Sequence, residues 1–230
     1  MQRQLFIYGS GRHTAPFLNY MAEATGKHKP NICFIPTASG DDKGYIERFH
    51  EVCNALNVTP HVLKVWVNSY DDKETFEAII SKMDAIVVGG GNTLNMLAIW
   101  KAQGIDKALE KAYNNGVVMG GGSAGSLCWF NGGTTDSRPA ELSIVEGMRF
   151  IDKSHCPHYN SEKSRRPLYH SNILNGDLTA GYACDDRSAI HFINEEVAKS
   201  VSLDADNHSY YVYENEGEII EEVIPGDIIS

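Results

Sequence analysis

Short runs of apolar residues alternate with longer amphipathic stretches through the first 130 residues of the 230-residue chain. The apolar runs lack the polar alternation of a half-exposed strand, and they cover residues 5–8, 32–35, 62–65, 85–88 and 117–119. Such runs are typical of parallel strands buried on both faces of a sheet. Helical patterns lie between and after them, at 16–25, 45–56, 72–82, 93–103 and 105–114. We therefore predict an α/β fold, a doubly wound and mostly parallel sheet with helices on both faces.

The pattern changes after Asn131. Residues 131–172 contain Gly132-Gly133, Pro-containing turns and many polar residues, which favours extended loops. Strand-like segments return at 178–193 and 209–223, the second with a turn at 215–217. Because 230 residues suit one domain, we expect a single α/β domain over 1–230, in which 131–172 is a loop-rich insertion.

Charge and cysteine content restrict the partners and the compartment. A formal net charge of −10 argues against binding to nucleic acid or anionic membranes, which requires clustered Lys and Arg. No stretch approaches the ~20 apolar residues of a membrane span, and the N-terminus has no signal-peptide core. The cysteines are odd in number and scattered, at Cys33, Cys53, Cys128, Cys156 and Cys184. We expect a cytoplasmic protein, since disulfide frameworks have paired cysteines.

Three glycine-bearing segments follow predicted strands: YGSG, GGGN and GGGSAG. In open parallel sheets, ligands bind beyond the carboxyl ends of the strands, so these segments mark the expected ligand edge. Gly9-Ser10-Gly11 resembles the start of a dinucleotide fingerprint, but Thr14 occupies the place of the third glycine. We predict no cofactor.

The segment Gly121-Gly122-Ser123-Ala124-Gly125 is a G-x-S-x-G motif between a strand and a helix-forming stretch. This context is that of a nucleophile elbow, which presents a serine hydroxyl on a sharp turn. The Ala124 amide would donate to a developing oxyanion, and so would the amide of Gly90 or Gly91 in the GGGNT turn. The alternatives are a phosphate-binding loop or a plain turn.

A serine nucleophile needs a base, and a histidine base needs an acid. Among nine histidines, His155 and His158 in KSHCPHYN are the best candidates, and their spacing does not separate them. The same pair could suggest a metal site, but no second ligand cluster accompanies it, so we predict no metal. Asp185-Asp186 in GYACDDRSAIHF provides candidate acids, with a polar turn as the alternative.

These motifs, in this order, resemble the peptidase E (alpha-aspartyl dipeptidase) family of serine peptidases. The resemblance rests on GGGNTLNML, GGGSAGS, the PHYN loop and the D-D-R-S-A strand, and it spans most of residues 1–195. Cyanophycinases are larger relatives of that family. The resemblance implies a fold like that of class I glutamine amidotransferases, which is flavodoxin-like, with Ser in place of Cys at the elbow.

The resemblance also implies roles for individual residues. Ser123 would be the nucleophile and His158, which follows the proline, the base. The acid position, usually Glu in the family, falls on Asp186, while Asp185 stays open because the shorter acid requires a closer approach.

Substrate-binding residues are expected near the substrate termini. Asp136 matches a family position near the substrate amine and could pair with a free N-terminal ammonium; an Asx-turn is the alternative. Arg165 or Arg166 could receive a substrate carboxylate bidentately, or both could be solvated. Their register departs from that of the enterobacterial members, which puts a strict preference for N-terminal Asp in doubt.

The function expected is that of a serine peptidase, dipeptidase-like, which cleaves short peptides with a free N-terminus, Asp-Xaa among them. Two alternatives stay open: a related serine amidase or cyanophycinase-like hydrolase, and a catalytically silent binding protein of the same fold. The expected partner is a small peptide substrate, without nucleic acid or membrane, and a homodimer stays open.

Overall fold

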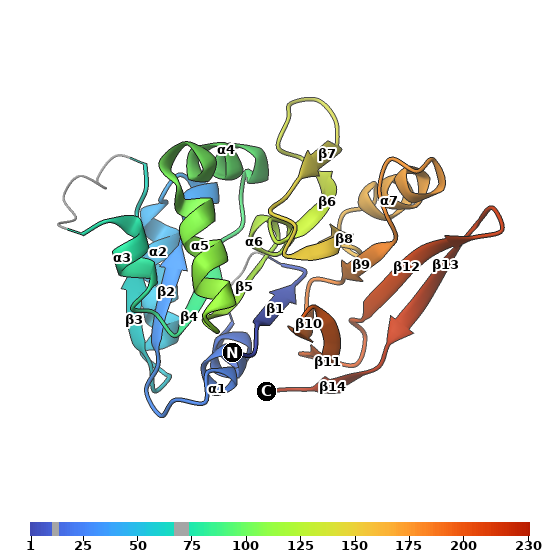
Figure 1. Ribbon diagram of the computed structural model, residues 1–230. Helices are drawn as coiled ribbons and strands as arrows, with labels where there is room; N and C mark the ends of the chain where they lie inside the picture. The colour runs from blue at the N-terminus through green and yellow to red at the C-terminus, as the bar shows by residue number, and fades with distance from the viewer. Residues whose placement is uncertain (11–13, 67–73) are drawn as a thin grey trace.

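The computed structural model describes residues 1–10, 14–66 and 74–230, which form an eight-stranded and a six-stranded sheet (Figure 1). One side of the larger sheet has the order β3-β2-β4-β5-β1, and these neighbours are parallel. Beyond β1, β10 and β11 continue the sheet in antiparallel pairs, and β14 pairs with β11 in parallel. The predicted α/β class with a doubly wound parallel sheet is confirmed. The bounds of the larger sheet are β1 (Gln4–Tyr8), β2 (Asn31–Ile35), β3 (Thr59–Val62), β4 (Ala85–Val88), β5 (Val118–Gly122), β10 (Ser188–Ile193), β11 (Glu196–Ser202) and β14 (Gly226–Ile228).

Helices cover both faces of the larger sheet, as the buried strands require. In β4, Ile86 and Val88 belong to the core formed with α3, α4 and α5, whereas Ala85 and Val87 belong to the core formed with α1 and α2. Successive strand side chains point to opposite faces, so one apolar run supplies both cores. The helix bounds are α1 (Ala15–Ala24), α2 (Lys43–Cys53), α3 (Phe76–Ile80), α4 (Thr93–Gln103) and α5 (Ile105–Asn114), with a 3-10 turn η1 (Thr37–Ser39) after β2.

The smaller sheet has the order β13-β12-β9-β8-β6-β7 and packs against α7 (Arg165–Leu174). Figure 1 shows its β12–β13 hairpin reaching away from the larger sheet. The prediction of extended loops over 131–172 is wrong, because most of that segment forms strands and a helix. The strand bounds are β6 (Phe130–Thr135), β7 (Ser143–Glu146), β8 (Ile151–Cys156), β9 (Gly181–Cys184), β12 (Ser209–Asn215) and β13 (Glu218–Ile224).

Some strands and helices begin or end at other residues than the sequence predicts. The strand expected at 62–65 is β3, three residues earlier, and it is a half-buried edge strand that tolerates Pro60. The helix expected at 72–82 is the shorter α3; residues 72 and 73 lie outside the described residues. All five cysteines are buried and free. Among the described residues, no helix has both the length and the apolar character that a membrane crossing needs.

Candidate active site

Ser123 occupies the sharp turn between β5 and α6 (Ala124–Leu127). Its backbone has φ 58° and ψ −119°, a strained conformation for a residue with a side chain. The turn also brings the chain close to β4, because a Cβ atom on Gly125 would lie 2.0 Å from the Val88 carbonyl oxygen. The glycine is therefore required for the close approach, and the serine is held at the carboxyl edge of the parallel sheet.

His158 brings Ser123 and an acid into one hydrogen-bonded line. Its Nε2 lies 2.8 Å from the Ser123 Oγ, and its Nδ1 lies 2.7 Å from the Asp186 Oδ1. A carboxylate accepts only, so Nδ1 carries the proton and Nε2 is left to accept from the serine hydroxyl. The His158 side chain is 18% exposed, which shelters the contact while leaving access to it. This is the arrangement of a serine nucleophile, a base and an orienting acid.

The two adjacent aspartates have different surroundings. Asp186 contacts His158, and its backbone amide donates to the Asn160 side chain at 3.1 Å. Asp185 is buried, and its Oδ2 accepts from the His208 amide at 2.8 Å. Burial raises the pKa of Asp185, and the bond from His208 partly offsets that rise. Of the two carboxylates left open by the sequence, only that of Asp186 is placed at the His158 ring.

The structure also separates His155 from His158. His155 is fully buried on β8, with Nδ1 3.0 Å from the Tyr182 carbonyl oxygen and Nε2 2.9 Å from the Ser126 Oγ. Burial lowers the pKa of His155 to about 3, so the ring is neutral near pH 7. In both His155 and His158, each of the two ring nitrogens therefore has a protein partner.

Backbone amides around Ser123 are candidates for oxyanion binding. The Gly90 amide donates to the Tyr45 hydroxyl at 3.1 Å, so it already has an acceptor. For the amides of Gly91 and Ala124, no acceptor is found within the described part of the chain. Gly91 has φ 135°, and a Cβ there would lie 2.3 Å from the Ala38 carbonyl oxygen. Of the two candidates in the GGGNT turn, Gly91 is the one whose amide has no acceptor in the described part of the chain.

A pocket of about 390 Å³ opens onto the Ser123–His158 pair. Besides Ser123, His158 and the two glycines, it is lined by Ser10, Tyr45 and Arg48. Burial raises the pKa of Tyr45 to about 12, which keeps the phenol neutral. Arg48 is an exposed cation that lines this pocket, and no ion pair with a carboxylate is found for it among the described residues.

The sequence interpretation missed the side chains from α2. Tyr45 and Arg48 are three residues apart in the helix that follows β2, so they share one face near the ligand edge. The three-residue spacing of these two side chains, in a helix that follows a buried strand, could have indicated that they face the ligand edge. Ser10 belongs to the YGSG segment that the sequence placed at this edge; Gly11 lies outside the described residues.

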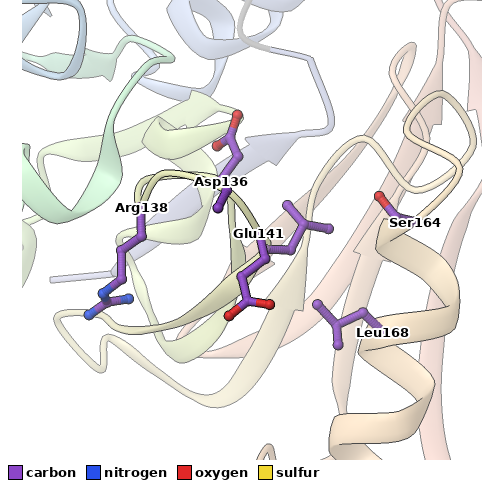
Figure 2. Close-up of a pocket in the computed structure, with 7 residues that line it drawn as sticks. Asp136, Arg138, Glu141, Ser164 and Leu168 are labelled. Atoms are coloured by element: carbon purple, nitrogen blue, oxygen red, sulfur yellow. The ribbon is translucent and has the colours of Figure 1, made fainter.

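Asp136 and Arg165 lie in a neighbouring part of the molecule. Asp136 lines a separate pocket of about 620 Å³, where Figure 2 shows its carboxylate directed away from Glu141 and Leu168. Arg165 is buried, and its guanidinium contacts the Asp136 carboxylate at 3.4 Å, the Thr134 carbonyl at 2.8 Å and the Glu162 carboxylate. With three protein acceptors, Arg165 is not free to receive a substrate carboxylate, contrary to the expectation.

Arg166 is also engaged by the protein. Its guanidinium pairs with the Glu221 carboxylate and lies over the rings of Tyr159 and Tyr210, 4.9 Å and 5.7 Å from their centroids. Neither arginine of the SEKSRRP segment lines the pocket of Ser123. The positive group in that pocket comes instead from Arg48.

Comparison with known proteins places these residues in a family context. The model of peptidase family S51 matches residues 5–200. The Bacillus subtilis protein named uncharacterized peptidase YgaJ is 43% identical over 206 residues, which cover 90% of this chain and 88% of that protein. Peptidase E of Haemophilus influenzae (strain PittGG) is 28% identical over 193 residues, with 80% and 79% covered.

Solved structures share the fold. The crystal structure of a peptidase from an acI-B1 Actinobacterium superposes with a TM-score of 0.75 at 19% identity, covering 98% of this chain and 95% of that one. A Listeria monocytogenes EGD-e protein assigned to peptidase E gives a TM-score of 0.68 at 21% identity, with 89% and 100% covered. At these identities the likeness concerns the fold alone.

Proposed function

Because the chain belongs to peptidase family S51, we propose that it is a serine peptidase that cleaves short peptides through an acyl-enzyme on Ser123. The observation that carries the proposal is the hydrogen-bonded line from the Ser123 Oγ through His158 to Asp186. A line of this kind activates a hydroxyl that is otherwise a weak nucleophile at neutral pH.

The proposed reaction has two halves. As the Ser123 Oγ attacks the scissile carbonyl carbon, its proton passes to His158 Nε2, and the carbonyl oxygen becomes an oxyanion held by the amides of Ala124 and Gly91. The C–N bond then breaks, and the leaving nitrogen takes the proton from His158. Water attacks the acyl-enzyme with His158 again as base, which releases the acid product and restores Ser123. Asp186 keeps the imidazole oriented and stabilises its charged form.

Two features of the pocket support a small substrate with an acidic group. Its volume of about 390 Å³ is near the lower end of the ~300–1,000 Å³ found for ligand pockets. Arg48 supplies a guanidinium in the same pocket, and this group binds carboxylates in a bidentate manner. We infer that peptides with an N-terminal Asp are among the substrates and that Arg48 contacts their side chain.

A dipeptide screen varied at the first residue tests this function. We expect hydrolysis of Asp-Xaa peptides, loss of cleavage when the amine is acetylated, and activity reduced by several orders of magnitude in Ser123→Ala, which lacks the nucleophile. Arg48→Met should lower kcat/KM for Asp-Xaa by roughly 10- to 100-fold, the weight of one charge-assisted contact, and leave Ala-Xaa nearly unchanged. Full activity in a folded Ser123→Ala variant would refute the mechanism, and equal losses for both peptides in Arg48→Met would refute the assigned contact.

A further inference from the structure

A second serine–histidine contact lies directly behind the first. Ser126 is three residues after Ser123, and His155 is three residues before His158; the Ser126 Oγ and the His155 Nε2 are 2.9 Å apart. Both side chains are fully buried, unlike Ser123 and His158. The Ser126 hydroxyl also lies 2.8 Å from the carbonyl oxygen of Ser123 itself. The buried contact is therefore connected to the strained residue that carries the candidate nucleophile.

The hydrogens of this network can be assigned from its acceptors. The Tyr182 carbonyl only accepts, so His155 Nδ1 carries a proton and, in the neutral ring, Nε2 is a bare acceptor. Ser126 has one hydroxyl proton, and the Ser123 carbonyl already receives the amides of Ser126 and Leu127, each at 3.0 Å. His155 Nε2 has no other donor among the described residues, and a buried acceptor without a donor is costly. The Ser126 hydroxyl thus donates toward two acceptors, the His155 Nε2 and the Ser123 carbonyl oxygen, and only the first has no other donor among the described residues.

The contact joins the two sheets at the site. Ser126 belongs to α6, which follows β5 of the larger sheet, whereas His155 belongs to β8 of the smaller sheet. The His155 ring is further fixed by stacking on Phe130, with centroids 4.6 Å apart. We propose that the Ser126–His155 hydrogen bond is a positioning contact that sets the distance between Ser123 and His158. The proposal rests on the proposed function of Ser123 as nucleophile.

Two replacements at His155, each of which keeps one of its two hydrogen bonds, test this role. In His155→Gln the side-chain amide reaches the place of Nε2 and can still bond Ser126, but the bond to Tyr182 is lost. In His155→Asn the amide reaches the place of Nδ1, so the Tyr182 bond is kept and the Ser126 bond is lost. Both variants lose the ring that stacks on Phe130, and Asn is one methylene shorter than Gln. Ser126→Ala leaves the His155 ring in place, so it separates loss of the hydrogen bond from loss of packing at residue 155.

The measurement is kcat for an Asp-Xaa dipeptide, divided by the number of sites titrated with a fluorophosphonate, so that misfolded protein does not count. We expect roughly a 10- to 100-fold loss in His155→Asn and Ser126→Ala, the effect of a displaced reacting pair. His155→Gln should stay within about 3-fold of the wild type, and KM should change less than about 2-fold in all three. Ser154→Ala is the control, since it removes a buried β8 hydroxyl that bonds Thr179 and Tyr169 instead; its kcat per site should match the wild type.

Wild-type kcat per site in both His155→Asn and Ser126→Ala would overturn the positioning role, and so would equal losses in His155→Asn and His155→Gln. These outcomes leave the proposed function intact, because the wild type is still labelled and active. A folded wild-type protein that is neither labelled nor active would instead overturn the function and the positioning role together.

Discussion

Asp185 and Asp186 are adjacent in sequence, yet their carboxylates do different things. Asp186→Asn removes the group that holds the His158 tautomer, so kcat/KM should fall by about 10³- to 10⁴-fold with little change in stability. Asp185→Asn weakens buried bonds to the His208 amide and to the Tyr210 hydroxyl, so the free energy of unfolding should fall by about 1–3 kcal/mol. The first effect is measured as kcat/KM, with the enzyme concentration taken from active-site titration with a fluorophosphonate. The second is measured by urea unfolding. A variant pair with the effects exchanged would contradict the assignment.

At the scale of single residues, the sequence predicts the place of a side chain where a short motif around that residue determines it. Ser123 lies in a motif whose glycines are needed for its own turn, and the family resemblance, through the proline before His158, indicated the histidine that lies beside Ser123. From the sequence, Arg165 and Arg166 are candidate substrate ligands because most of their partners are distant in the chain, although Glu162, which pairs with Arg165, is only three residues away. Thr134 and Glu221 are 31 and 55 residues away, respectively. A sequence pattern does not reveal that a charged side chain is already paired.

At the scale of secondary-structure elements, a carboxylate on the β12–β13 hairpin bonds several side chains of the segment after His158. Glu221 on β13 accepts from the Tyr159 hydroxyl and from Arg166, and lies 3.0 Å from His170 Nε2. Burial opposes the charge of Glu221, but the bonds from Arg166 and Tyr159 outweigh it and lower its pKa.

Glu221→Gln should therefore weaken the attachment of the hairpin. We expect the free energy of unfolding to fall by about 1–2 kcal/mol, the cost of weakened charge-assisted bonds, with a lower urea midpoint. Glu218→Gln, an exposed site on the same strand, is the control and should leave the midpoint unchanged. Equal midpoints for both variants would show that Glu221 does not hold the hairpin.

Some elements could be read from the sequence and others could not, for physical reasons. The bounds of α4 and α5 were predicted because Asn92 caps the first helix and Gly104, with φ 73°, separates the two. Strands β6 and β8 were missed because they bury polar residues. Gly133 resembled a loop residue, but a Cβ there would lie 1.9 Å from the His155 carbonyl oxygen, so the strand pair needs glycine.

At the scale of the whole molecule, buried His155 makes stability depend on pH. Burial lowers its pKa from an ordinary value of 6.5 to about 3 in the folded protein, so the unfolded chain takes up a proton first as the pH falls. The stabilisation is complete above the ordinary value and is lost progressively toward pH 3. From pH 7 to pH 5 the loss from His155 is about 2 kcal/mol.

Urea unfolding of the wild type and of His155→Gln at both pH values isolates this contribution, because the other titrating groups are common to both. The wild type should lose about 2 kcal/mol more than the variant over this interval. Equal losses would mean that His155 is not buried as a neutral ring.

The whole molecule also explains why the site was only partly predictable. Ser123 follows a strand of the larger sheet, and His158 follows a strand of the smaller sheet. Chain order predicted which residues could meet, but the second sheet was not foreseen, and so neither were the contacts behind the site. The side chains that α2 contributes to the pocket, Tyr45 and Arg48, were also not predicted, because their place depends on how the helix packs beside the sheet.

If the Ser123 hydroxyl is the nucleophile, a reagent that reacts with activated serines should attach to it. The protein is treated with a fluorophosphonate, and peptide mass spectrometry locates the adduct. We predict one adduct on Ser123, none in Ser123→Ala, and slow labelling in His158→Ala, where the base is missing. Dipeptide hydrolysis that persists in Ser123→Ala, or an adduct on another residue whose removal abolishes hydrolysis, would contradict the account.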